Sequence, residues 1–398
     1  MHVQIFGGKI IMEEHKKQNK RVIKQNKTIN KNNSKFTPID AKEYRSLKIM
    51  FHKTLPNYFF VRTKRLLLSY AYNGSGFIGI NHKLRDNLNN KYDMIDINHA
   101  YQYALVNYEY PLSSKHTIID NINLTYEEFT KKYKNKHFVA KVNIYNVKTK
   151  YNEFDYNIFT NNLLIHFDNS AKMFYDGWLC DIDLISFRKL YNCDIYISYA
   201  MIFEEWGELG CKDFIYSKVA ELDKLKGNEE LYKNYKVALH IATYGKNAQR
   251  VDSDGTRSEY IPIAIYQTAY TRAYMIDIYT KYYKYIAYVD SDSFMILHNS
   301  KLINKLDIGS GLGQFKIEYE NKKIYIGRIK GYFVFADNGD LIKQRWSGIK
   351  TILTKRQINN IINCKDFYVE EERVVKGKKV KQKILVRNNE DKGYKLKI

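Results

Sequence analysis

Two carboxylates, Asp290 and Asp292, lie two residues apart in the stretch Tyr288–Ile296, and their spacing could hold a metal ion. β-Branched, aromatic and apolar residues run into and out of the polar tip, a pattern that predicts a tight strand–turn–strand. Alternate side chains of an extended backbone project to the same face, so the two acids repel each other unless a cation lies between them. The alternative interpretation is a solvated hairpin turn, where Asp and Ser are common.

A third acid, Asp96, follows a short apolar strand and precedes a helix. The residues that recur at helical spacing after it are Ala100, Tyr101, Ala104 and Leu105. A carboxylate at such a junction is well placed for a metal, since the backbone carbonyls that follow, beginning with Ile97, can also face the ion. The alternative is that Asp96 caps the helix.

Composition limits the classes of partner. The 398 residues include 65 Lys and Arg against 43 Asp and Glu, which gives a formal net charge of +22 and an isoelectric point near 9.4. This excess suits a polyanion, because each phosphate that Lys or Arg neutralises releases condensed counterions. No apolar run approaches the roughly 20 residues that span a bilayer, and no signal peptide or CxxC pattern is present. We expect a cytoplasmic nucleic-acid protein of two or three subdomains with no membrane partner and reduced cysteines.

Two helices are expected near the candidate acids. Residues 212–246 predict the longest helical stretch, which Gly227 interrupts. In its second half, helical spacing creates one basic and polar face where a core helix would be apolar. The side chains of that face are Lys233, Lys236, His240 and Tyr244. Residues 260–283 predict an amphipathic helix with Pro262 in its first turn, which leads directly into the Asp290/Asp292 hairpin.

The other predicted elements are short. Residues 46–80 predict strand and loop, including the apolar run Leu66–Tyr72, and Gly74 and Gly76 then permit a turn or a close backbone approach. An Asp-Ser-Asp pattern at residues 252–254 lies among polar residues and predicts a loop. Further strands are expected at Phe138–Val142, Leu163–Phe167, Asp194–Tyr199, Phe315–Tyr319, Lys323–Ile326 and Gly331–Ala336, with a hairpin at 374–379.

The ordered motifs resemble the polymerase domain of family B DNA polymerases, most closely the protein-primed subfamily of phages and linear plasmids. Asp96–Tyr101 resembles the first palm motif, Asp-x-x-Ser-Leu-Tyr, and Tyr288–Ser293 resembles Tyr-x-Asp-Thr-Asp-Ser. Tyr72–Gly76 resembles the template-contacting Tyr-x-Gly-Gly/Ala element, and Lys330–Tyr332 resembles Lys-x-Tyr. The resemblance extends from about residue 60 to residue 350.

The resemblance implies an α+β fold: a right-hand polymerase with an antiparallel palm sheet, helical fingers and a small β-rich thumb. It implies a template-directed DNA polymerase that extends a primer 3′-hydroxyl by two-metal phosphoryl transfer in protein-primed replication. The expected parts are a basic disordered arm (1–45), the N-terminal palm (46–140), a palm insertion with the fingers (141–250), the palm with the catalytic hairpin (251–340) and the thumb (341–398).

Specific roles follow from the resemblance. The catalytic residues would be Asp96, Asp292 and Asp290, and two Mg²⁺ ions, or Mn²⁺ in their place, would be held by Asp96, Ile97 and Asp292. The nucleotide-binding residues would be Tyr101, Lys233, Lys236 and Tyr244. The DNA-binding residues would be Tyr72, Gly74, Gly76, Ser293, Lys330 and Tyr332. The implied partners are a DNA primer–template, deoxynucleoside triphosphates, a terminal protein primer and a separate exonuclease chain, in the cytoplasm of a phage host.

The sequence also departs from the family's motifs. The finger motif Lys-x-x-x-Asn-Ser-x-Tyr-Gly ends in Tyr244-Gly245, but its other positions differ. The departures are Val237, Ile241 and Ala242 in the finger motif, and His99 and Gln102 in the first palm motif. Only 95 residues precede Asp96, too few for the family's proofreading exonuclease. Two alternatives therefore stay open: a catalytically impaired polymerase-like DNA-binding protein, and a basic scaffold whose matches are accidental.

Overall fold

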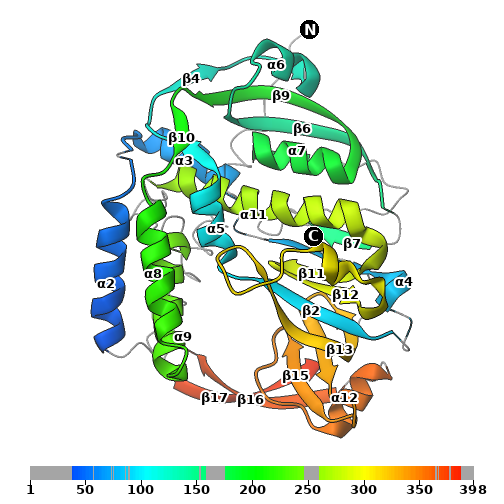
Figure 1. Cartoon of the computed structure of the whole chain (residues 1–398). Coiled ribbons are helices and arrows are strands. Elements are labelled where there is room, and N and C mark those ends of the chain that lie inside the picture. Colours follow the sequence, from blue (N-terminus) through cyan, green and yellow to red (C-terminus); the bar gives the residue numbers. More distant parts are fainter. Residues whose placement is uncertain are drawn as a thin grey trace.

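The computed structural model describes residues 38–386, apart from residues 57, 73, 75, 86, 88–89, 152–153, 158–174, 246–259, 364, 366 and 376–377. Two antiparallel sheets lie one above the other in Figure 1, with the long helix α11 (Ile261–Tyr282) between them. A group of helices flanks both sheets on one side, and a β-rich lobe lies below. Residues 1–37 of the predicted disordered arm lie outside the described residues, and the prediction is wrong for residues 38–45, which belong to helix α2 (Pro38–His52).

The large sheet carries the candidate acids. Its strand order is β15-β14-β13-β2-β12-β11-β1-β7, and every neighbouring pair is antiparallel. The central strand β2 lies between β12 and β13, which are distant from it in sequence. The strands are β1 (Phe77–Asn81), β2 (Tyr92–Ile97), β7 (Phe154–Asn157), β11 (Ile286–Ser291), β12 (Ser293–Leu297), β13 (Phe315–Arg328), β14 (Gly331–Phe335) and β15 (Leu341–Trp346).

The predicted strand–turn–strand at Asp290 and Asp292 is confirmed as β11 and β12, which pair with each other. The predicted strands at Phe315–Tyr319 and Lys323–Ile326 are one long bent strand, β13, with register shifts along it. Two short helices follow strands of this sheet: α4 (His82–Arg85) comes after β1, and α5 (Ala100–Asn107) comes after β2.

A second sheet has the order β4-β9-β6-β8, with β5 paired to β9. It includes residues 116–119, which the sequence analysis grouped with the palm, because β4 pairs with β9 rather than with the large sheet. The predicted strand Leu163–Phe167 lies outside the described residues. The elements of this part are β3 (Glu109–Pro111), β4 (His116–Ile119), β5 (Leu124–Thr125), α6 (Tyr126–Lys132), β6 (Phe138–Thr149), β8 (Tyr175–Cys180), α7 (Asp181–Leu190), β9 (Tyr191–Phe203) and β10 (Trp206–Glu208).

Helix α11 is present at the predicted position. The prediction that it is amphipathic is wrong over its first half, while its second half exposes Asp277 and Lys281. Every residue of Ile261–Arg272 is buried, because that half of the helix lies in one apolar core and the other half lies in a second. Even Arg272 is enclosed, and its guanidinium forms hydrogen bonds of 2.7 and 2.9 Å with the Asp183 carboxylate. A buried charge of this kind needs such a partner.

The flanking helices are α2 (Pro38–His52), α3 (Arg62–Ala71), α8 (Lys212–Lys224) and α9 (Glu229–His240). The helix pair interrupted at Gly227 is confirmed. The strand-and-loop prediction for residues 46–80 is wrong over α2 and α3. The run Leu66–Tyr72 is too short to separate a strand from a buried helix by pattern alone. Its leucines favour a helix, in which Leu68 and Ala71 are buried.

The C-terminal lobe contains α12 (Lys355–Ile362), β16 (Phe367–Val375) and β17 (Lys378–Val386). The predicted hairpin near residue 376 is confirmed by the antiparallel pairing of β16 and β17. A small core joins this lobe to the large sheet through Phe333 and Trp346. In the described part of the chain, none of the helices combines the length and apolar character that crossing a bilayer requires. Three cysteines, Cys180, Cys193 and Cys211, are free thiols.

Candidate active site

The hairpin between β11 and β12 turns very tightly around Ser291. Ser291 has a left-handed backbone, with φ of 64°, and the Asp292 N–H donates to the Asp290 carbonyl over 2.8 Å. This conformation is uncommon for a residue other than glycine and marks a turn held in place by its surroundings. The turn separates the two acids, so that each has its own partners.

Asp292 faces Asp96. The register pairs Ser293 of β12 with Asp96 of β2, and the Ile97 N–H donates to the Asp292 carbonyl over 2.9 Å. Burial, followed by the charges of Asp96 and Asp290, raises the pKa of Asp292 to about 7. Burial also raises the pKa of Asp96, against the effect of nearby Lys316. The two carboxylates therefore form a partly buried pair of like charges, in which the Asp96 side chain stays 25% exposed.

Asp290 lies in a different environment. Its Oδ1 accepts a 2.9 Å hydrogen bond from Lys330 Nζ, and the Tyr288 hydroxyl lies 3.3 Å from its Oδ2. The Lys330 N–H in turn donates to the Tyr288 hydroxyl over 2.7 Å. The Tyr332 ring lies 6.0 Å from the Tyr288 ring. The structure thus brings Lys330 and Tyr332 to the hairpin, where Lys330 neutralises Asp290.

Two further charged residues, Lys316 and Glu318, lie at the acid pair. Lys316 pairs in register with Asp96, and its Nζ lies 3.2 Å from Asp96 Oδ1 and 3.4 Å from Glu318 Oε1. Glu318 also contacts Lys343 at 3.0 Å. The sequence analysis missed these residues because no motif contains them. Their i, i+2 spacing indicates only that they share one face of a strand, and it does not show that this strand pairs with β2.

The glycine-containing segment before β1 lies directly against the hairpin. A Cβ atom placed on Gly76 would lie 2.4 Å from the Ser291 Cα, so no side chain fits there. The Gly74 carbonyl accepts a 3.2 Å hydrogen bond from the Tyr244 hydroxyl. Tyr72 ends α3 on the same segment. The close backbone approach that the two glycines permitted is therefore present at Gly76.

Two aromatic rings face each other beside the acids. Tyr101 and Tyr244 are stacked, with ring centroids 4.0 Å apart and an interplanar angle of 12°. His240 lies edge-on to Tyr101 at 5.6 Å. Burial and the nearby Asp292 charge raise the pKa of Tyr101 to about 12. The first palm motif and the end of the finger motif therefore meet, although Tyr244 belongs to a separate π-helical turn, Ile241–Gly245.

The two candidate nucleotide-binding lysines differ in their surroundings. Burial and then the Lys236 charge lower the pKa of His99 to about 4, and the Lys236 charge also acts on Asp96. Lys233 is exposed and forms an ion pair of 2.6 Å with Glu229, one helical turn earlier. Both lysines are exposed, but the Lys236 charge acts on His99 and Asp96, whereas Lys233 is paired with Glu229.

The acid pair has the donor chemistry that Mg²⁺ takes in proteins. The described residues contain no ready-made group of three or more His, Cys, Asp or Glu side chains for a metal. However, Mg²⁺ is usually bound by one or two carboxylates, with waters and substrate phosphates completing its octahedron. Like charges held close together and partly shielded from water, such as Asp96 and Asp292, gain most from a cation between them. The residues present therefore fit Mg²⁺.

Comparison with solved structures identifies the fold. The match to phi29 DNA polymerase, complexed with primer-template DNA and incoming nucleotide substrates, has a TM-score of 0.67 and 16% sequence identity. The fold is that of phi29 DNA polymerase. The match covers 88% of this chain and 67% of that chain, so this chain spans about two thirds of the phi29 polymerase length.

Other phi29 polymerase structures match similarly. The orthorhombic crystal form gives a TM-score of 0.65 at 16% identity, covering 88% of this chain and 67% of that one. The complex with single-stranded DNA gives 0.62 at 17% identity, covering 88% and 66%. The sequence itself matches no protein-family model and no curated protein. The expected α+β architecture with a curled antiparallel sheet is confirmed.

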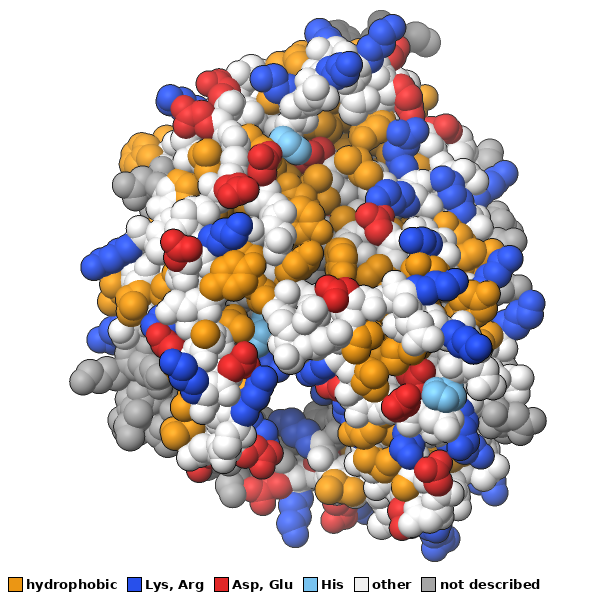
Figure 2. All heavy atoms as spheres, viewed as in Figure 1, with side chains coloured by type: hydrophobic (Ala, Val, Ile, Leu, Met, Phe, Trp, Pro, Cys, Tyr) orange, Lys and Arg blue, Asp and Glu red, His pale blue; other side chains and the backbone are white. Residues whose placement is uncertain are grey.

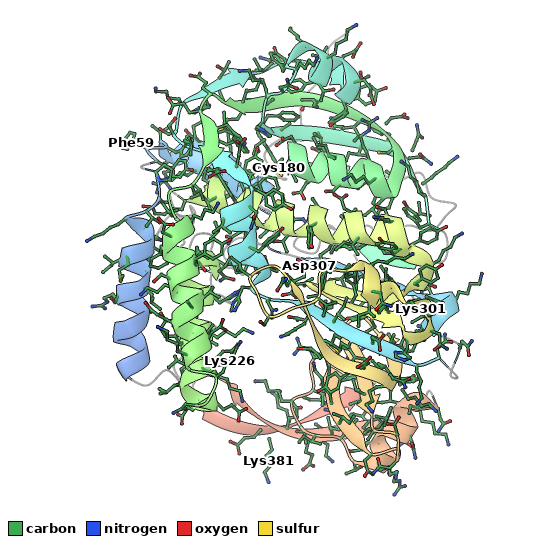
Figure 3. All side chains as sticks on the ribbon, viewed as in Figure 1. Phe59, Cys180, Lys226, Lys301, Asp307 and Lys381 are labelled. Atoms are coloured by element: carbon green, nitrogen blue, oxygen red, sulfur yellow. The ribbon has the colours of Figure 1, made fainter. Side chains whose placement is uncertain are left out.

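We use palm as a name for the large sheet, fingers for the lobe of α2, α8 and α9, and thumb for the C-terminal lobe. Figure 2 shows an opening through the molecule between fingers, palm and thumb, with Lys and Arg side chains around its edge. Figure 3 shows Lys226 on the finger side and Lys381 on β17 below. The Lys226 charge also contributes to lowering the pKa of His99.

Proposed function

We propose that this protein is a template-directed DNA polymerase that adds deoxynucleotides to a primer 3′-hydroxyl. The observation that carries the proposal is the half-buried pair of Asp96 and Asp292, on neighbouring strands of a sheet in a fold similar to that of a DNA polymerase. Two like charges held together cost stability unless they serve a cation. A protein that only bound DNA would gain nothing from carboxylates near phosphates. The proposal therefore favours catalysis over the impaired DNA-binding alternative.

The acid pair would hold Mg²⁺ through Asp96 and Asp292, with the Ile97 carbonyl as a third oxygen ligand. Bound Mg²⁺ ions supply positive charge that lowers the pKa of the primer hydroxyl and stabilises the leaving pyrophosphate. Asp290 would act differently, because Lys330 already neutralises it. We assign Asp290 the role of fixing Lys330, and with it the hairpin, beside the primer terminus.

The fingers would supply the charge that meets the triphosphate. Lys236 is the favoured residue, because its charge already reaches Asp96 and His99. Such a charge stabilises the negative charge that grows in the transition state. Lys233 would take part only if its ion pair with Glu229 opens. Tyr101 would lie under the deoxyribose and Tyr244 at the nascent base pair.

The opening between fingers, palm and thumb would take the primer–template duplex. Backbone contacts from Lys and Arg position a duplex without reading its sequence. The residues near the hairpin that would touch DNA are Tyr72, Gly74, Gly76, Ser293, Lys330 and Tyr332. The proposal has two extensions. A terminal protein of a phage or linear element would serve as the primer, and a separate chain in the host cytoplasm would carry out proofreading.

Primer extension tests the proposal. A 5′-labelled primer annealed to a template of defined sequence is incubated with the purified protein, Mg²⁺ and one deoxynucleotide at a time. Extension only with the nucleotide complementary to the next template base supports the proposal. Addition without regard to the template, or no addition with Mg²⁺ or Mn²⁺, contradicts it.

A further inference from the structure

A buried hydrogen bond joins the palm to the fingers behind the stacked tyrosines. Gln102 Nε2 donates to Thr243 Oγ1 over 2.8 Å, between α5 and the π-helical turn. Gln102 is 2% exposed and Thr243 is fully buried. Each is the immediate chain neighbour of one ring of the stack, because Tyr101 precedes Gln102 and Tyr244 follows Thr243.

The π-helical turn presents Thr243 to the palm. The Thr243 hydroxyl donates to the Leu239 carbonyl over 2.8 Å, so the same oxygen accepts from Gln102 while its proton stays within the fingers. A π-turn changes the direction in which side chains leave a helix and occurs often at functional sites. Here it lets one hydroxyl bind its own helix and the palm together.

A second glutamine, Gln267 of the buried helix α11, forms hydrogen bonds with the backbone of the same two segments. Its Nε2 donates to the Tyr101 carbonyl over 2.8 Å and lies 3.4 Å from the Thr243 carbonyl. Its Oε1 is buried without a hydrogen-bond partner among the described residues. A buried polar atom left without a partner destabilises a fold. An apolar side chain would pack at this position without that cost. We therefore explain the Gln267 amide by its hydrogen bonds to the backbone carbonyls of Tyr101 and Thr243.

We propose that Gln102 and Thr243 are positioning residues that hold Tyr101 against Tyr244 and thereby set discrimination between deoxyribonucleotides and ribonucleotides. The inference rests on the proposed function. A ring that excludes a 2′-hydroxyl must be held to well under an ångström, because small displacements admit the extra oxygen. The side-chain bond between residues 102 and 243 fixes both rings from behind, where it touches no substrate.

Removal of the bond, with overall shape kept, tests the inference. The variants are Gln102→Met, Thr243→Val, the double variant and Thr243→Ser, which keeps the hydroxyl. The affinities for dATP and ATP are measured on a complex with a dideoxy-terminated primer opposite template dT, so that binding is read without chemistry. The ratio of incorporation efficiencies is then measured with a normal primer.

We expect Gln102→Met and Thr243→Val each to lower the preference for dATP over ATP about tenfold, which corresponds to about 1.4 kcal/mol. The double variant should lose no more than the larger single loss, because both changes remove one bond. Thr243→Ser should keep the preference. The matched control is Thr130→Val, whose hydroxyl makes the same type of helical bond, to the Tyr126 carbonyl over 2.8 Å, outside the site.

Several outcomes would overturn the inference. If the variants melt at lower temperature but keep the dATP preference, the bond is structural only. If the wild type binds dATP and ATP equally, it does not discriminate between the two sugars, and Gln102 and Thr243 cannot have the proposed role. If Thr130→Val changes the preference as much as Thr243→Val, the effect is not local. Absence of extension by the wild type would contradict the proposed function, whereas the binding ratio would still decide this inference.

Discussion

The ammonium group of Lys316 lies 3.2 Å from Asp96 Oδ1, on the strand that pairs directly with β2. It also contacts Glu318, so a cation of the chain itself already lies between two acids of the site. A divalent ion that approaches Asp96 must work against this charge.

Replacing Lys316 by Met should therefore raise the affinity for divalent cations, on the order of tenfold at low salt. Calorimetric titration with Mn²⁺ measures it. Lys322→Met is the matched control on the same strand, because Lys322 pairs with exposed Asp337 at 2.9 Å, away from Asp96. Unchanged or weaker Mn²⁺ binding in Lys316→Met would show that Lys316 does not oppose the ion.

Gly76→Ala should disable the site while Gly227→Ala should not. A Cβ on Gly76 would meet the Ser291 backbone at 2.4 Å, which displaces the turn that carries Asp292. Gly227 has nothing within 4 Å of the corresponding position. We expect incorporation to fall at least about a hundredfold for Gly76→Ala, since misplacement by about an ångström has that effect. Equal activity of the two variants would mean that the hairpin tolerates the displacement.

Lys236→Ala should raise the KM for deoxynucleotides at least about tenfold, because a charge near the triphosphate is lost. Its affinity for primer–template should change little. Lys233→Ala is the matched control on the same helix, one turn away, where the lysine is paired with Glu229. Steady-state extension over a range of nucleotide concentrations separates KM from kcat. An effect of Lys233→Ala as large as that of Lys236→Ala would contradict the assignment.

The sequence alone predicted the main parts of the site but not their surroundings. Asp96 and the Asp290/Asp292 hairpin lie between apolar strands, so alternation and turn residues were enough to find them. Lys316 could not be found, because its role arises from the pairing of β13 with β2, which strand patterns do not specify.

Two errors of fold have similar causes. Residues 62–71 form a helix because Leu68 and Ala71 are buried by distant segments, and a short apolar run does not show this. Helix α11 was expected to expose one face along its length, but its first half is enclosed by an apolar core. The difference between Lys233 and Lys236 on α9 is also tertiary, because only packing of the fingers on the palm decides that the Lys236 charge acts on Asp96.

The metal-free protein should lose stability as pH rises from about 4 to 8. The folded-state pKa of Asp292 is raised to about 7, so its stabilising contribution is complete below the unfolded value and disappears as pH passes 7. The pKa of Asp96 is raised in the same direction. Asp292→Asn should remove much of this loss, on the order of a few kcal/mol. Melting temperatures in EDTA at pH 5 and pH 8 measure it.

The control variant is Asp337→Asn. Its melting temperature should change between pH 5 and pH 8 as much as that of the wild type. Asp337 is exposed, and hydrogen bonds from Lys322 and Lys91 lower its pKa. If Asp292→Asn loses as much stability between pH 5 and pH 8 as the wild type does, Asp292 ionises normally in the folded protein.

The central claim is that Asp96 and Asp292 form one catalytic centre. The direct measurement is single-nucleotide primer extension with Mg²⁺ by the wild type, Asp96→Asn and Asp292→Asn, with primer–template affinity determined for each. We predict that both variants lose incorporation by at least about a thousandfold, while DNA affinity is unchanged or higher because each loses a negative charge. Incorporation by either variant within about tenfold of the wild type would contradict the claim.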